Sequence, residues 1–315
     1  MPRVSVIIPS YNRAELVVET IESVLAQSFK DFEIIVVDDG STDDTREAVS
    51  KLDGPVRYIY QENMGRSRAR NAGFKASAGE YVCFLDSDDL FVQEKLESQV
   101  ELLQGREGAG FVYCDYSFID QAAKPLDKPP VYSSHPLRRG SIFRHMLYFD
   151  FIPTPTVLAR RECVEAVGLF DPLLEPTEDF DWLLRLSKRY EADYVSEPMC
   201  LIRAHPGNTP SSAIAEATMR VLVSHLSLDD TKKVLGKDWR RVYRDSYLTV
   251  ANYHYNSADL KRAREYYLKA LRVEPSRAID LQTGRLLLKS FLGVTVLDAA
   301  RRVRERFSKE PAGIL

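Results

Sequence analysis

The 315-residue chain has little cysteine, and none of its cysteines form a CxxC pair. This spacing does not match a zinc site, so we expect buried, reduced thiols at Cys83, Cys114, Cys163 and Cys200 in a cytoplasmic protein. Long apolar runs are also missing, because no run approaches the roughly 20 residues that a membrane-spanning helix needs. The apolar run Val4–Ile8 ends at Pro9 and is too short for the core of a secretory leader, so we expect none.

An excess of positive charge is absent as well. The chain contains 43 Lys and Arg against 46 Asp and Glu, a formal net charge of -3, which excludes bulk electrostatic attraction to nucleic acid. No GxGxxG motif follows the first apolar run, which argues against a dehydrogenase. Pro9-Ser10-Tyr11-Asn12 stands there instead of a Gly-rich loop, which also argues against a sugar-1-phosphate nucleotidyltransferase.

The first third of the chain alternates between strand and helix patterns. Apolar runs at 3–8, 33–37, 56–60 and 81–85 predict strands, and residues 14–27 and 64–78 have helical spacing. Such β-α repetition is typical of a parallel, doubly wound sheet of the α/β class. Ligands of these sheets bind beyond the carboxyl ends of the strands. We therefore expect the polar residues after the first, second and fourth strands to face one cleft.

The rest of the chain divides at about residue 210. Between 110 and 210 the pattern is less regular, with a predicted strand at 111–119, a long loop at 121–138 and an amphipathic helix at 179–190. From about 211 onward the pattern is all helical. We therefore expect two domains, residues 1–210 and residues 211–315.

The fourth predicted strand ends in the acidic turn Asp86-Ser87-Asp88-Asp89. Two carboxylates separated by one residue can share a divalent cation, and hard oxygen ligands suit Mg²⁺ or Mn²⁺, which commonly bridge to substrate phosphates. The other interpretation of these residues is a solvated helix cap, because Ser and Asp are good cap residues.

Six motifs in order resemble the family 2 glycosyltransferases with the GT-A fold: VSVIIPSYNR, DFEIIVVDDGSTDDT, ENMGRSRARNAG, AGEYVCFLDSDD, VGLFDPLLEPTEDFDWLLRL and LIRAHPGN. The resemblance covers roughly residues 2–210. It implies a Rossmann-like, doubly wound, mostly parallel sheet, followed here by an α-helical C-terminal region. It also implies an inverting enzyme that moves a sugar from a nucleotide diphosphate sugar, with a UDP-sugar favoured, to an acceptor hydroxyl in glycan or cell-surface polysaccharide synthesis.

The resemblance also implies a donor site. Its residues are Pro9, Tyr11, Asn12 and Arg13 around the nucleotide, Asp39 as acceptor from uracil N3–H, Arg66 and Arg70 near the pyrophosphate, and Asp86 and Ser87 near the ribose or donor sugar. A carboxylate only accepts hydrogen bonds, which suits a base edge that offers a donor. The residues alone leave open that Asp39 is a turn residue and that the two arginines belong to a solvated basic face.

The resemblance further implies a metal site and a general base. Asp88 matches the metal ligand of the DxD motif, and His205 matches an additional metal ligand. The implied cofactor is Mn²⁺ or Mg²⁺. Asp179 matches the base that takes the acceptor proton, and a helix N-terminus favours its ionised form. A helix cap at Asp179 and a loop histidine at His205 are the alternatives. Trp182 either stacks on an acceptor sugar or packs in the core.

The C-terminal stretch is basic, with eight Lys and Arg against four Asp and Glu in residues 276–315. It resembles a basic amphipathic surface helix. Contact with the inner membrane face near a lipid-linked acceptor, packing on the catalytic domain, and a homodimer contact all fit this pattern. A non-catalytic nucleotide-binding or helical adaptor is the alternative function, against which the presence of Asp39, Asp86, Asp88 and Asp179 argues.

Overall fold

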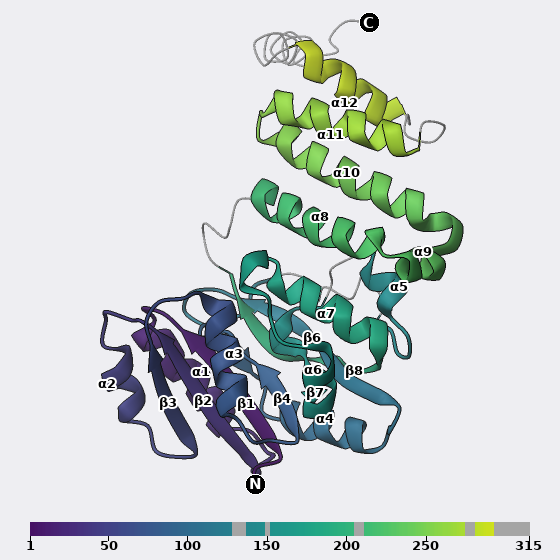
Figure 1. Ribbon diagram of the computed structural model, residues 1–315. Helices are drawn as coiled ribbons and strands as arrows, with labels where there is room; N and C mark the ends of the chain where they lie inside the picture. The colour runs from purple at the N-terminus through teal and green to yellow at the C-terminus, as the bar shows by residue number, and fades with distance from the viewer. Residues whose placement is uncertain (128–136, 149–151, 205–210, 275–280, 293–315) are drawn as a thin grey trace, which may run out of the picture. The chain divides into compact units, whose positions relative to one another are not determined.

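The computed structural model describes residues 1–127, 137–148, 152–204, 211–274 and 281–292, and the chain divides into two compact units, Met1–Asn208 and Thr209–Leu315 (Figure 1). The strands of the first unit are β1 (Val4–Ser10), β2 (Phe32–Asp39), β3 (Val56–Gln61), β4 (Tyr81–Phe84), β5 (Leu90–Phe91), β6 (Ala109–Ile119), β7 (Leu158–Arg160) and β8 (Glu191–Arg203). Its α-helices are α1 (Ala14–Leu25), α2 (Thr45–Ser50), α3 (Arg66–Ala76), α4 (Lys95–Gln104), α5 (Phe143–Met146), α6 (Arg161–Val167) and α7 (Glu178–Arg189).

The eight strands form one mixed sheet in the order β3-β2-β1-β4-β7-β6-β8-β5. β1 pairs in parallel with β2 and β4, β2 with β3, and β6 with β8. β7 runs antiparallel to β4 and β6, and β5 runs antiparallel to β8. The predicted doubly wound, mostly parallel sheet is confirmed.

The winding of the sheet changes direction beside β1. The chain moves outward from β1 to β2 and β3 and then returns to the other side of β1 as β4. Right-handed crossovers therefore place α1 and α2 on one face and α3 on the other (Figure 1). The carboxyl ends of β1 and β4 flank this switch point, where α/β sheets bind their ligands.

Close packing of α3 on the sheet depends on one glycine. A Cβ at Gly73 would lie 2.3 Å from Cγ2 of Ile7 in β1, so a larger residue would push α3 away from the strand. Ile35 and Val37 of β2 pack against Ala69 of the same helix. The start of α3 is thereby fixed beside the ends of β1 and β2.

All the cysteines and several large aromatic side chains of the first unit are buried in its core. All four cysteines are buried and free, as predicted. Trp182 is 1% exposed, and its ring lies 5.7 Å from that of Phe84 and 5.1 Å from that of Phe170. Of the two roles that the sequence allows for Trp182, the structure supports core packing.

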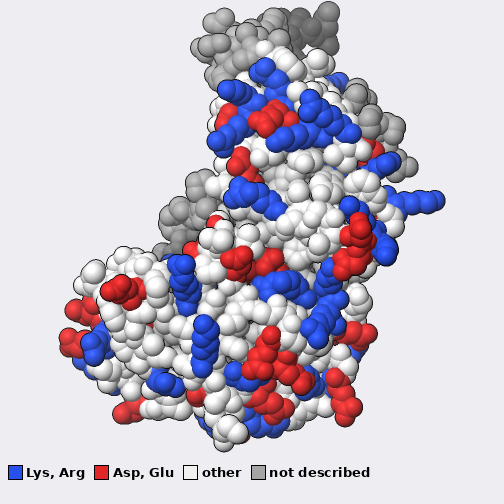
Figure 2. Space-filling view, in the orientation of Figure 1, with Lys and Arg blue, Asp and Glu red and all other residues white. Residues whose placement is uncertain are grey.

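The second unit is helical in its described part, with α8 (Ser211–Ser227), α9 (Asp229–Leu235), α10 (Trp239–Asn256), α11 (Leu260–Val273) and α12 (Leu281–Leu292). Small and aromatic residues pack α10 against α11 around Ala251, Ala263 and Tyr267. Lys and Arg side chains gather over α11 (Figure 2). No described helix combines the length and the apolarity needed to cross a membrane. Most of the predicted basic amphipathic stretch, residues 293–315, lies outside the described residues, so the membrane and dimer contacts stay predictions.

Candidate functional site

The loop after β1 is held to the loop after β2. The backbone N–H of Asn12 donates to Oγ of Ser41 at 2.9 Å, and Oδ1 of Asn12 accepts from the backbone N–H of Thr42 at 2.7 Å. Asn12 adopts a φ of 51°, a left-handed conformation that asparagine tolerates better than most residues. Pro9 is buried near the end of β1, and Tyr11 is exposed in the turn that follows this strand.

Asp39, the last residue of β2, joins that strand to the start of α3. Its Oδ1 accepts from Nε2 of Gln61 at 2.6 Å and from the N–H of Met64 at 2.9 Å, and its Oδ2 accepts from the N–H of Gly65 at 2.8 Å. Gly65 has a φ of 91°, which favours glycine. A carboxylate offers about four acceptor positions, so Asp39 can accept one further hydrogen bond in addition to these three.

A buried arginine connects β4 with α7. Arg70 of α3 is 2% exposed, and its guanidinium donates to Oδ1 of Asp86 and to Oε1 of Glu178, both at 2.7 Å. Nε of the half-exposed Arg66 lies 2.9 Å from the same Glu178 oxygen. The sequence-predicted residues Arg66, Arg70 and Asp86 are therefore brought together, and contact of the two arginines with a pyrophosphate stays a prediction.

Burial and charge oppose each other in this network. Burial acts to raise the pKa of Asp86, but the adjacent guanidinium of Arg70 outweighs it and lowers that pKa below its ordinary value. Burial raises the pKa of Glu178, and the nearby charge of Asp179 adds to this increase although Arg70 opposes it. Arg70 thus bridges the two carboxylates, and Arg66 adds a second cation at Glu178.

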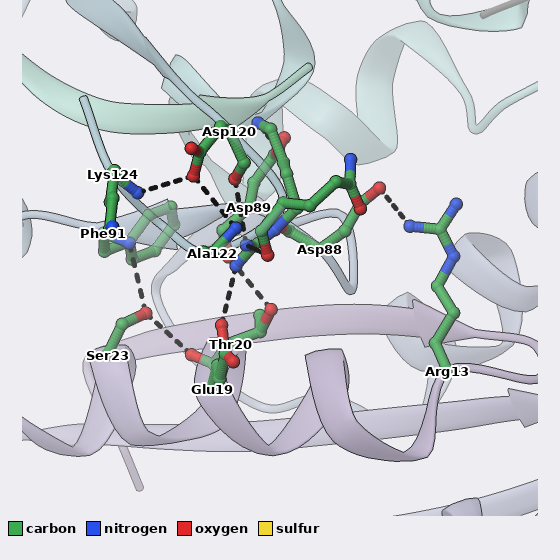
Figure 3. Close-up of polar contacts among 12 residues, drawn as sticks. Arg13, Glu19, Thr20, Ser23, Asp88, Asp89, Phe91, Asp120, Ala122 and Lys124 are labelled. Atoms are coloured by element: carbon green, nitrogen blue, oxygen red, sulfur yellow. Dashed lines mark hydrogen bonds and ion pairs between the residues drawn. The ribbon is translucent and has the colours of Figure 1, made fainter. Parts of the chain in front are cut away.

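The acidic turn after β4 is held by two more arginines, of which Arg13 is labelled in Figure 3. Arg13 forms an ion pair with Asp88. Arg203, at the end of β8, donates from Nε to the backbone carbonyl of Asp88 at 2.8 Å and from its backbone N–H to Oδ1 of Asp89 at 2.9 Å. Burial, with the charges of Asp86 and Asp88, raises the pKa of Asp89 well above its ordinary value. Ser87 is buried within the same turn.

Asp179 lies in the first turn of α7 and is half-buried. Its Oδ1 accepts from the N–H of Phe180 at 2.8 Å, and its Oδ2 lies 3.5 Å from Oγ1 of Thr154, which is buried. Both contacts orient the carboxylate without covering it. A partly exposed, oriented carboxylate can accept a proton from a hydroxyl group.

The donor chemistry of the acidic turn fits a divalent cation. Asp86 and Asp88 offer carboxylate oxygens, which Mg²⁺ and Mn²⁺ prefer. Among the described residues, however, no three His, Cys, Asp or Glu side chains lie close enough to hold a metal ion alone. An incomplete protein ligand set suits an ion that is also bound by substrate phosphates. His205, the predicted additional ligand, lies outside the described residues.

Several residues of the site are not among the predicted ones. Glu178 links Arg66 and Arg70, Arg203 holds the acidic turn, and Thr154 lies beside Asp179. Oε1 of Glu175 accepts from the N–H of Ser67 at the start of α3. The one sequence signal for Arg203 was its place at the end of an apolar run in LIRAHPGN, where a charge must be buried with partners.

Comparisons with known proteins give a family match and several similar relatives. The model of the family described as Glycosyl transferase family 2 matches residues 5–161. An uncharacterized glycosyltransferase of Rickettsia felis is 41% identical over 65% of this chain and 33% of its own length, so the chain spans about a third of that relative. The Escherichia coli protein named UDP-Glc:alpha-D-GlcNAc-diphosphoundecaprenol beta-1,3-glucosyltransferase WfaP is 32% identical over 69% of this chain and 83% of its own length.

Solved structures show the same fold. The structure of S. aureus TarS residues 1–349 in complex with UDP matches with a TM-score of 0.66 and 19% identity, over 88% of this chain and 82% of that one. The mannosyltransferase PcManGT from Pyrobaculum calidifontis, in complex with GDP-Man and Mn²⁺, matches with a TM-score of 0.58 and 21% identity, over 98% of this chain and 88% of that one.

Proposed function

We propose that the chain, which belongs to glycosyltransferase family 2, transfers a sugar from a nucleoside diphosphate sugar to an acceptor hydroxyl with inversion at the anomeric carbon. The observation that carries the proposal is the Arg70 bridge. This guanidinium joins Asp86 beyond β4 to Glu178, the neighbour of Asp179, at the start of α7. The acidic turn and the half-buried Asp179 are thereby held beside the switch point of the sheet.

In the proposed reaction Asp179 is the general base. It takes the proton of the acceptor hydroxyl while that oxygen bonds to the anomeric carbon, and the bond from this carbon to the diphosphate breaks. A single displacement inverts the configuration and needs no nucleophilic carboxylate, unlike the covalent route of retaining glycosidases. The contacts of Asp179 with Thr154 and Phe180 support this role because they favour an ordered carboxylate that stays partly exposed.

The leaving diphosphate gains negative charge, which the site must offset. A Mn²⁺ or Mg²⁺ ion held by Asp88 and the diphosphate would supply positive charge there. The complex of PcManGT with GDP-Man and Mn²⁺ is compatible with this assignment. Arg13, Arg66 and Arg70 add positive charge to the same region, and all three pair with protein carboxylates that would otherwise repel the diphosphate.

Nucleotide binding provides the test of this function. We expect UDP to raise the stability of the chain in the presence of Mn²⁺, by about 2.7 kcal/mol when the ligand is at about a hundred times Kd. The increase should vanish in Asp88→Ala, and thermal unfolding with and without Mn²⁺ measures both. A lack of any shift with UDP, GDP and their sugars would favour the alternative of a non-catalytic adaptor.

Asp39 gives a test of the proposed uridine preference. Uracil presents an N3–H donor, and Asp39 can accept one further hydrogen bond, whereas cytosine presents an acceptor at N3. We expect wild type to bind UDP about tenfold more tightly than CDP, a difference of about 1.4 kcal/mol. Asp39→Asn should lose most of this preference, as titration calorimetry with both nucleotides measures. If Asp39→Asn binds UDP and CDP with the wild-type affinities, a residue other than Asp39 recognises the base.

For the acceptor, we propose a chemical class and not a single compound. The name of the Escherichia coli relative specifies a diphosphoundecaprenol acceptor, and we propose a glycan or lipid-linked acceptor of cell-surface polysaccharide synthesis. Catalysis is assigned to residues 1–210. Residues 211–315, with 20 Lys and Arg against 12 Asp and Glu, are assigned to contact with the acceptor, a second copy or the anionic inner membrane face.

A further inference from the structure

Three arginines offset the charge of the acidic turn, and they differ in how firmly they are held. Arg70 is buried and donates to both Asp86 and Glu178. The Arg203 side chain is fully buried and donates to the backbone carbonyls of Asp88, Asp120 and Gln121 and to Glu19. Removing either cation from its partners would leave several buried acceptors unsatisfied, so both are fixed parts of the fold.

The Arg13 guanidinium has fewer hydrogen-bond partners than those of Arg70 and Arg203. Its side chain is 36% exposed, and within the described residues its guanidinium hydrogen-bonds to Asp88 alone (Figure 3). It lies in the turn after β1, whereas Asp88 lies in the turn after β4, so this single pair spans the switch point. The Asp88 side chain is only 12% exposed, so the pair is partly buried, but in the part of the chain that the structure describes Arg13 makes a single side-chain contact and is therefore the cation of the three whose release leaves the fewest acceptors unsatisfied.

We propose that Arg13 occupies Asp88 in the nucleotide-free protein and competes there with the divalent cation, so that metal and nucleotide bind cooperatively. This inference rests on the proposed function. A guanidinium and a divalent cation repel each other, and Asp88 cannot pair fully with both. A nucleoside diphosphate supplies new anionic oxygens, which suit an arginine especially well. Release of Arg13 from Asp88 is therefore costly without nucleotide and nearly cost-free with it.

The proposal predicts that removing Arg13 strengthens metal binding by the nucleotide-free protein. We expect Arg13→Gln to bind Mn²⁺ alone about five- to tenfold more tightly than wild type, a size typical of couplings between sites. Arg13→Lys, which keeps the charge, should retain weak binding. By linkage, UDP should tighten Mn²⁺ binding strongly in wild type and less in Arg13→Gln.

The experiment is a Mn²⁺ titration of the full chain, followed by the electron paramagnetic resonance signal of free Mn²⁺, with and without UDP. Arg106→Gln is the matched control, because Arg106 is also partly exposed but pairs with Glu191 and Asp193, away from the acidic turn. It should bind Mn²⁺ as wild type does. Unfolding temperatures establish that each variant is folded.

Three results would contradict these claims, the first the proposed function and the other two the inference alone. If Asp88→Ala binds Mn²⁺ with UDP as tightly as wild type, the metal site of the proposed function is wrong, and the inference fails with it. If Mn²⁺ binding depends on Asp88 but Arg13→Gln binds Mn²⁺ alone no more tightly than wild type, the inference alone is overturned. Equal coupling between UDP and Mn²⁺ in wild type and Arg13→Gln would overturn it as well.

Discussion

Asp179→Asn is expected to slow sugar transfer about a thousandfold, within the range that general bases contribute. Asparagine has the shape of aspartate and can keep the contacts with Thr154 and the N–H of Phe180. It cannot take a proton from the acceptor, so the loss should lie in the rate of the chemical step. The measurement is the single-turnover rate with enzyme in excess over donor sugar, at saturating acceptor.

The effect on Asp179 must be separated from a general effect of acidic residues near α7. Asp171→Asn is the control, because Asp171 is exposed and caps the short turn Pro172–Leu174 by accepting from the N–H of Leu173. Its transfer rate should stay close to wild type. The Asp179→Asn variant should also keep the wild-type affinity for UDP and the wild-type unfolding temperature. A transfer rate within a factor of about ten of wild type would assign the proton to another acceptor.

The parts of the fold that were predictable are those that the local sequence dictates. Residues 4–8 and 33–37 are apolar apart from Ser5 and Glu33, and such runs form strands when both faces of a sheet are covered. α7 was predicted within one residue at each end because its apolar positions recur at helical spacing. For β8, in contrast, the local pattern predicts a strand only over 198–204, because its first part carries the exposed Glu191 and Glu197 and the buried Asp193, which pairs with Arg106.

The contacts of the site were harder to predict than the elements, because they join residues far apart in the chain. Arg70 and Glu178 are separated by 108 positions, and Arg13 and Asp88 by 75. A local pattern identifies Glu178 as a helix-start residue and Arg70 as a helical basic residue, and both statements are true. Only the return of the chain from β3 to β4 and the packing of α7 near α3 make them one ion pair.

Arg70→Met is expected to lower the free energy of unfolding by about 3–5 kcal/mol, the usual result of removing one partner from a buried ion pair. Methionine fills much of the same space but leaves the carboxylate of Glu178, which is 1% exposed, without its main cation. Asp86 loses the hydrogen bond that lowers its pKa. Urea denaturation at pH 7 measures the change. Arg66→Met is the matched control, because Arg66 pairs with the same Glu178 oxygen but is half-exposed, and about 1 kcal/mol or less is expected there.

The cause of this loss can be separated from a packing defect by protonation and by a second substitution. Burial raises the pKa of Glu178, so the folded state of Arg70→Met binds a proton more readily than the unfolded chain. Its stability deficit relative to wild type should therefore shrink as the pH falls from 8 to 5. The double variant Arg70→Met, Glu178→Gln removes the uncompensated charge and should recover part of the loss at pH 8. A deficit that is independent of pH and unchanged in the double variant would show that Arg70 stabilises the fold by filling space rather than by neutralising Glu178.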